Sequence, residues 1–176
     1  MKAILLLLGI CMMPCSAVRA QSFTFVEYNV ENIFDTRHDE GKQDEEFLPE
    51  ATRNWTEKRY WRKLDQIGKA ILSTKEDGIP DMVALCEVEN DQTLHDLTKR
   101  SLLRNAGYEY VMTTSPDARG VDVALIYSPF SFKLMRSYGL RIETIEGMKA
   151  TRDILCFRAL QDATLHQLHK TLAHVL

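Results

Sequence analysis

The sequence predicts a layered α/β fold, and three observations indicate it. Short apolar runs typical of strands alternate with segments of helical periodicity, in the order strand, helix, strand, helix and then mostly strands. The 176 residues show no internal repeat and are enough for one core. Two short acidic patches, 29–31 and 86–89, directly follow predicted strands, and ligands of layered sheets gather beyond strand ends.

The first part of the chain predicts a strand, a long loop and a helix. The strand covers Phe23–Tyr28, and an acidic surface loop follows at 37–54. A helix begins near Asn54 or Thr56, because apolar residues then recur at helical spacing. Its basic residues either touch a phosphate backbone or form the solvated face of the helix, which we favour. They are Lys58, Arg59, Arg62 and Lys63 of the helix, together with Arg53, which precedes it.

The remainder predicts a second helix within a series of strands. Met82–Cys86 is an unbroken apolar run, as expected of a fully buried strand. Asp91 is a suitable N-cap for a helix that ends at Asn105–Gly107. Four further strands are predicted at 108–114, 121–127, 132–138 and 152–157. A turn at 115–120 joins the first two of them.

The first twenty residues predict an export signal. Lys2 provides the positive start, Ile4–Met13 the apolar stretch and Val18–Ala20 a small-residue cleavage site. The apolar stretch is too short to span a bilayer comfortably, so we expect a secreted or periplasmic protein without a membrane anchor. Cleavage after Ala20 leaves 20 basic and 25 acidic residues, a net charge of −5. That balance gives no support for a broadly basic nucleic-acid-binding surface.

Two cysteines remain after cleavage, Cys86 and Cys156. Both lie in apolar runs, where buried, inert thiols are common. A disulfide between them is the alternative in an oxidising compartment, and the sequence leaves the choice open.

The two acidic patches indicate a cation site. Asn29 and Glu31 follow the first strand, and Glu87 follows Met82–Cys86. Carboxylate and amide oxygens suit a hard divalent cation such as Mg²⁺, which polarises phosphoryl oxygens. A solvated loop residue is the alternative for Glu31. Glu87 is the stronger candidate, because a buried unpaired carboxylate is costly.

Six segments taken together resemble one known family. They occur in order as Tyr28–Asp35, Phe47–Pro49, Trp55–Tyr60, Ala84–Asn90, Arg119–Tyr127 and Thr151–Leu155. The series resembles the endonuclease/exonuclease/phosphatase superfamily, with the fold of DNase I and the apurinic endonucleases, and looks closest to a secreted bacterial subgroup. The resemblance covers roughly Phe23 to Phe157. It implies the N-terminal part of a two-sheet α/β sandwich with helices outside.

The resemblance also implies a metal-dependent phosphoesterase that uses Mg²⁺ or Mn²⁺ and a phosphate-ester substrate, either nucleic acid or a small phosphoester. It places Glu87 at the metal, with Asn29 and Glu31 orienting metal waters or phosphate. Residues implied at the phosphate or the edge of the cleft are Arg119, Asp122 and Arg152. The alternative is a turn residue for Arg119 and an ordinary edge charge for Arg152.

The end of the chain departs from the family pattern. The family's catalytic His, its Gly-Asp-x-Asn motif and its closing Asp-His pair have no counterpart here. We therefore expect a family domain at 21–158 and an atypical tail at 159–176, frameshifted or ended early. The tail's spacing is closer to helical, and its histidines, His166, His169 and His174, lack acidic partners beyond Asp162.

These departures predict a weakly active or inactive chain with an exposed apolar sheet face that promotes self-association. A non-catalytic cation- or phosphate-binding module and an associating interaction fragment are the alternatives.

Overall fold

The computed structural model describes residues 23–144, 146–161 and 169–173. The expected export signal, His166 and His174 lie outside these residues. The strands are β1 (Phe25–Ile33), β2 (Met82–Val88), β3 (Glu109–Met112), β4 (Asp122–Tyr127), β5 (Phe132–Leu140), β6 (Ile154–Gln161) and β7 (His169–Ala173). The helices are α1 (Glu57–Leu72) and α2 (Asp91–His95), with short turns η1 (Glu45–Phe47), η2 (Asp96–Arg100) and η3 (Leu102–Asn105).

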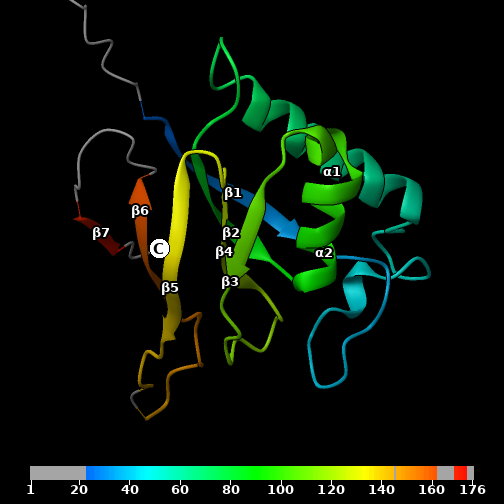
Figure 1. Cartoon of the computed structure of the whole chain (residues 1–176). Helices are drawn as coiled ribbons and strands as arrows, with labels where there is room; N and C mark the ends of the chain where they lie inside the picture. The colour runs from blue at the N-terminus through cyan, green and yellow to red at the C-terminus, as the bar shows by residue number, and fades with distance from the viewer. Residues whose placement is uncertain (1–22, 145, 162–168, 174–176) are drawn as a thin grey trace, which may run out of the picture.

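The described strands form two sheets. One has the order β1-β2-β4-β3, with β1 and β2 parallel and the other two pairs antiparallel. The other is an antiparallel sheet of order β5-β6-β7. Figure 1 shows α1 and α2 on one side of the four-stranded sheet and β5–β7 on the other side. The fold is therefore the mixed α/β sandwich with two sheets that the sequence predicts.

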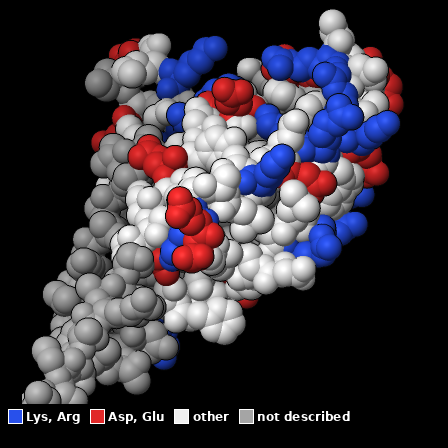
Figure 2. Space-filling model, turned by 90° about the horizontal axis from the view of Figure 1, so that it is seen from above, with Lys and Arg blue, Asp and Glu red and all other residues white. Residues whose placement is uncertain are grey.

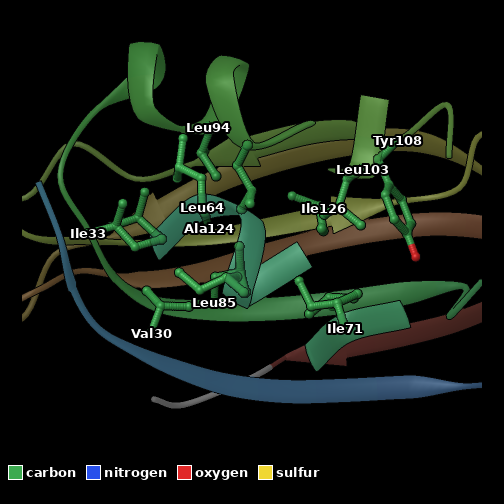
Figure 3. Close-up of a cluster of buried hydrophobic side chains, with 14 of the residues drawn as sticks. Val30, Ile33, Leu64, Ile71, Leu85, Leu94, Leu103, Tyr108, Ala124 and Ile126 are labelled. Atoms are coloured by element: carbon green, nitrogen blue, oxygen red, sulfur yellow. The ribbon is translucent and has the colours of Figure 1, made fainter. Parts of the chain in front are cut away.

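The alternation of side chains in β2 and β4 builds a core on each face of the first sheet. Val83, Leu85 and Ile126 pack toward the helices in a cluster that includes Leu64 and Ile71 (Figure 3). On the other face the buried cluster joins residues of both sheets, namely Met82, Val123, Leu125, Phe132, Leu155, Phe157 and Ala159. The inner sheet face is therefore covered by β5 and β6.

The helices begin close to their predicted starts. Thr56 is the N-cap of α1, whereas Asn90 rather than Asp91 caps α2, because its side chain accepts from the Thr93 N–H. The second helix is also shorter than expected: α2 gives way to one π-helical turn and a 3₁₀ turn. No helix among the described residues is long and apolar enough to cross a membrane.

The tail differs from the expected helical spacing. β6 continues past Phe157 to Gln161, and His169–Ala173 is a strand paired with β6. The helical interpretation of this segment is therefore wrong for His169–Ala173. Apolar spacing alone misleads here because a short run near the end of a chain fits both periods.

The outer face of β5 and β6 carries exposed apolar side chains. Tyr138 is 50% exposed and Leu140 is 52% exposed. Tyr138 pairs with Cys156, which lies between the buried Leu155 and Phe157 and so faces outward. Self-association through this face stays a prediction.

The two described cysteines are free thiols in different layers. Cys86 pairs with Val123, whose side chain belongs to the inter-sheet core, whereas Cys156 faces away from that core. Because the side chains of a disulfide must point toward each other, this arrangement does not support the intrachain pairing left open above. Burial raises the pKa of the Cys86 thiol.

Candidate metal and phosphate site

The parallel pairing of β1 and β2 brings the two acidic patches to one edge of the sheet. Asn29 is the register partner of Cys86, the residue before Glu87. Both strands are irregular at this point, with register shifts between Asn29 and Ile33 and between Cys86 and Val88. We call Asn29, Glu31, Glu87, Arg119 and Arg152 the strand-end group.

Three residues of this edge adopt a backbone conformation that favours glycine. φ is +53° at Glu31, +61° at Asn32 and +67° at Glu87. For side chains other than glycine this left-handed region costs about 1–2 kcal/mol per residue. Bulges and strained residues often re-aim side chains at functional sites. Here the bulge at Glu87 interrupts the alternation of side chains along β2, so the Glu87 side chain does not continue the pattern of core residues.

Glu87 is partly buried and lies close to one guanidinium. Its side chain is 17% exposed, and its Oε1 lies 3.8 Å from Nη1 of Arg152. No other hydrogen bond or ion pair of the described residues involves the Glu87 carboxylate. The carboxylate is therefore only weakly engaged by protein groups.

Arg152 has the least satisfied side chain of the group. Its Nε and Nη1 atoms are buried and have no hydrogen-bond partner. Buried donors in native proteins nearly always find a partner, so each exception needs an explanation. A guanidinium with free donors matches the oxygens of a phosphate or carboxylate in bidentate geometry.

Arg119 is fixed by its own loop. Its Nη2 and Nε donate to Asp117 at 2.8 and 3.2 Å, and Lys42 donates to the Asp117 carbonyl at 3.2 Å. Its pKa is raised mainly by the hydrogen bond to Asp117 and also by the charge of Glu87. Asp117 therefore holds the Arg119 guanidinium in place, and this guanidinium is close enough to Glu87 for their charges to interact.

Asp122, which the sequence predicts at the edge of the cleft, is a buried carboxylate at the start of β4. It pairs with Val88, next to Glu87 along the chain. Its Oδ1 accepts from the Thr113 hydroxyl at 2.6 Å, from the Ser115 N–H at 2.9 Å and from the Ser115 hydroxyl. The structure places its carboxylate in a hydrogen-bond network that joins the ends of β3 and β4.

Asn29 and Glu31 are joined by a local hydrogen bond. The Asn29 Oδ1 accepts from the Glu31 N–H at 2.9 Å, and both side chains are exposed. The Glu31 carbonyl accepts from Lys63 Nζ at 2.5 Å. Glu31 therefore enters this arrangement through its backbone as well as its exposed carboxylate.

Sequence reasoning did not single out Lys63 and Glu89. The sequence favours a solvated helix face for Lys63 and its basic neighbours, yet Lys63 is partly buried and donates to the end of β1. Glu89 is 5% exposed; its Oε2 accepts from the Asp35 N–H at 2.6 Å and its buried Oε1 has no partner. Burial raises the pKa of Glu89 to about 8, and the nearby Asp35 charge adds to the shift. The spacing of Glu87 and Glu89, two residues apart at the end of β2, is the available signal, but the bulge breaks the alternation there.

The described residues contain no cluster of three or more His, Cys, Asp and Glu suited to a metal. The donor set at this edge is the Glu87 carboxylate and the Asn29 amide oxygen, with the exposed Glu31 carboxylate available to orient metal-bound water. Mg²⁺ commonly uses one or two carboxylates and keeps several waters, so these residues fit such an ion. They do not fit a metal that needs three or four protein ligands.

The charged surface is mixed on the face that Figure 2 displays. Lys and Arg side chains are interspersed with Asp and Glu, and much of this face is uncharged. The part of this face that is described therefore carries charges of both signs.

Comparisons with known proteins identify the family. The model of the endonuclease/exonuclease/phosphatase family matches residues 24–172, which continues past the boundary expected at 158. No curated protein gives a significant match.

Several solved structures are similar in fold. A conserved protein of unknown function from Enterococcus faecalis has 10% identity and a TM-score of 0.50, over 80% of this chain and 48% of that one. The human Nocturnin catalytic domain with bound sulfate has 17% identity and a TM-score of 0.48, over 80% and 44%. The mannosyl-6-phosphatase of Bacteroides thetaiotaomicron has 17% identity and a TM-score of 0.46, over 79% and 45%.

This chain spans a little under half the length of these solved structures. The family assignment comes from the match over residues 24–172, together with the two-sheet α/β architecture. The chain belongs to the endonuclease/exonuclease/phosphatase family.

Proposed function

We propose that the strand-end group is the metal and phosphate side of a phosphoesterase site that hydrolyses phosphate esters. The observation that carries the proposal is Arg152, whose partly buried guanidinium group has two buried donors without a hydrogen-bond partner and lies 3.8 Å from the Glu87 carboxylate. A phosphoryl group offers the acceptor oxygens that these donors lack. Family membership supports the same chemistry.

Glu87 and Asn29 are the residues proposed to hold Mg²⁺ or Mn²⁺. Such an ion polarises a phosphoryl oxygen and stabilises developing charge. Because Glu87 is the only carboxylate proposed as a direct ligand, with Glu31 orienting metal-bound water, we expect weak binding with most of the coordination sphere filled by water.

We assign a distinct role in phosphate binding or in support of the site to each remaining residue. Arg152 donates to phosphate oxygens, and Arg119, oriented by Asp117, adds positive charge at the same edge. The Asn29 amide oxygen accepts from the Glu31 N–H, which favours one orientation of this side chain. Asp122 supports the site by joining the ends of β3 and β4.

One observation favours a second candidate, a cation- or phosphate-binding module without turnover. The two histidines whose side chains the structure describes, His38 and His95, contact Asp44 and Asp96 rather than the strand-end group. A placed general base contributes about 10²- to 10⁴-fold to proton-transfer steps. Binding without hydrolysis is the outcome expected if no other residue supplies that base.

The test is hydrolysis of bis(p-nitrophenyl) phosphate by highly purified protein with Mn²⁺. Turnover that Glu87→Gln abolishes, that Arg152→Met weakens mainly through KM, and that Arg62→Met leaves unchanged would support the phosphoesterase. Arg62 is a suitable control because it is an exposed arginine of α1. Turnover that Glu87→Gln leaves unchanged would contradict the proposal. Mn²⁺ binding at Glu87 without turnover would instead favour the binding module.

We also propose export with cleavage after Ala20, based on Lys2, the apolar stretch and Val18–Ala20. Mass spectrometry of protein recovered from the periplasm or medium should give Gln21 as the first residue. Exported protein that retains Met1–Ala20 would contradict it.

A further inference from the structure

The turn that follows Asn29 needs support from outside itself. Glu31 and Asn32 are consecutive non-glycine residues with positive φ. Such residues persist only where surrounding contacts hold them. The local bond from the Glu31 N–H to the Asn29 side chain is exposed to solvent, so it gives little support by itself.

Lys63 of α1 supplies this support. Its ammonium donates to the Glu31 carbonyl at 2.5 Å and to the Asn32 carbonyl at 3.0 Å, which binds the two strained residues together. These contacts link residues more than 30 positions apart in the sequence, so they fix the end of β1 against a helix.

The position of Lys63 is itself restricted. Its ammonium lies 5.7 Å from the ring centroid of Trp55, whose Nε1 donates to the Phe34 carbonyl at 2.9 Å. Burial lowers the pKa of Lys63, while the charges of Glu31 and Glu87 raise it. Lys58, Arg62 and Lys69 of the same helix are exposed, so Lys63 differs from its basic neighbours.

We infer that Lys63 is a positioning residue, which holds the turn after Asn29 so that the Asn29 amide stays beside Glu87. This inference rests on the proposed metal site. The change in divalent-ion affinity on removing Lys63 separates a positioning role from a simple effect of its charge. Loss of a cation near Glu87 would by charge alone tighten binding of a divalent ion. Loss of a positioning contact weakens binding, typically by about 10- to 100-fold for supporting residues around a metal.

The experiment measures Mn²⁺ affinity by electron paramagnetic resonance and amide exchange by NMR, both well below the unfolding temperature. Lys63→Met should weaken Mn²⁺ binding by about 10-fold or more. It should also speed exchange of the Glu31 amide, because the turn that holds this bond is released. Lys63→Arg, which keeps charge and several donors, should retain more of the affinity than Lys63→Met. Lys69→Met, an exposed lysine of the same helix, should match the wild type in both measurements.

Three results would overturn the inference: unchanged affinity, tighter binding, or an equal effect of Lys69→Met. Wild-type protein that binds no Mn²⁺ would instead overturn the proposed metal site. The exchange of the Glu31 amide would still show whether Lys63 holds the turn, so the two failures are distinguishable.

Discussion

The layer between α1 and the first sheet differs in kind from the edge where β1 and β2 end. In that layer Leu64, Ile71 and Leu85 are fully buried and adopt ordinary helix or strand positions. At the edge, Glu31 and Glu87 have left-handed backbones and Arg152 has buried donors without partners. Stability therefore comes from the apolar layer, while the edge combines backbone strain with buried polar donors that a bound anion could satisfy.

The largest expected effect comes from the apolar layer. Leu64→Ala should lower the free energy of unfolding by about 2–5 kcal/mol, because it removes buried contacts and leaves a cavity. Leu102→Ala is the control, since Leu102 is 45% exposed and should cost less than about 1 kcal/mol. Urea unfolding followed by circular dichroism measures both. Equal losses would mean that the layer is not packed as described.

A pH-dependent effect is expected at Glu89. Its pKa in the folded protein is raised to about 8, above its value in the unfolded chain, so the folded state binds the extra proton. Stability should therefore fall as pH rises from about 4.5 to 8, by a few kcal/mol at most, because one pKa unit corresponds to about 1.4 kcal/mol. Glu89→Gln removes the titration.

The variant should gain stability relative to the wild type over that pH range. Unfolding of both proteins in metal-free buffer at pH 5 and pH 9 measures the difference. A stability difference that is the same at both pH values would show that Glu89 is not protonated in the folded state.

The smallest expected effect on stability concerns strain at Glu87. Glu87→Gly should raise the free energy of unfolding by about 1 kcal/mol, because glycine adopts a φ of +67° without the penalty of a side chain. Lys133→Gly, at an exposed position of β5, should lower it by about 0.5–1 kcal/mol. Thermal unfolding without metal compares them. A loss of stability in Glu87→Gly would show that the side chain contributes more than the backbone strain costs.

The sequence predicts most elements because their apolar periodicity is local. Met82–Cys86 is an unbroken apolar run and lies within β2, and the apolar spacing from Tyr60 to Leu72 matches α1. The tail is the exception. Its strand at His169–Ala173 is defined by pairing with β6, which local spacing does not encode.

The candidate site is predictable only in part. The sequence identifies Asn29 and Glu87 as candidates because they follow predicted strands within acidic segments. The parallel pairing of β1 and β2 then places them at the same edge of the sheet. The backbone conformation of Glu87, the network around Asp122 and the bonds of Lys63 depend on contacts between residues distant in sequence. A charge pattern on a helix does not show which lysine turns toward a neighbouring strand.

The most direct test of the account is a Mn²⁺ titration of the purified chain, comparing wild type with Glu87→Gln. The expected result is weak binding by the wild type and affinity lowered by about 10-fold or more in the variant, because the only carboxylate assigned as a direct ligand is lost. Glu109→Gln, which removes an exposed carboxylate of β3, should leave the affinity unchanged. Equal affinity of wild type and Glu87→Gln would contradict the placement of the metal at this edge.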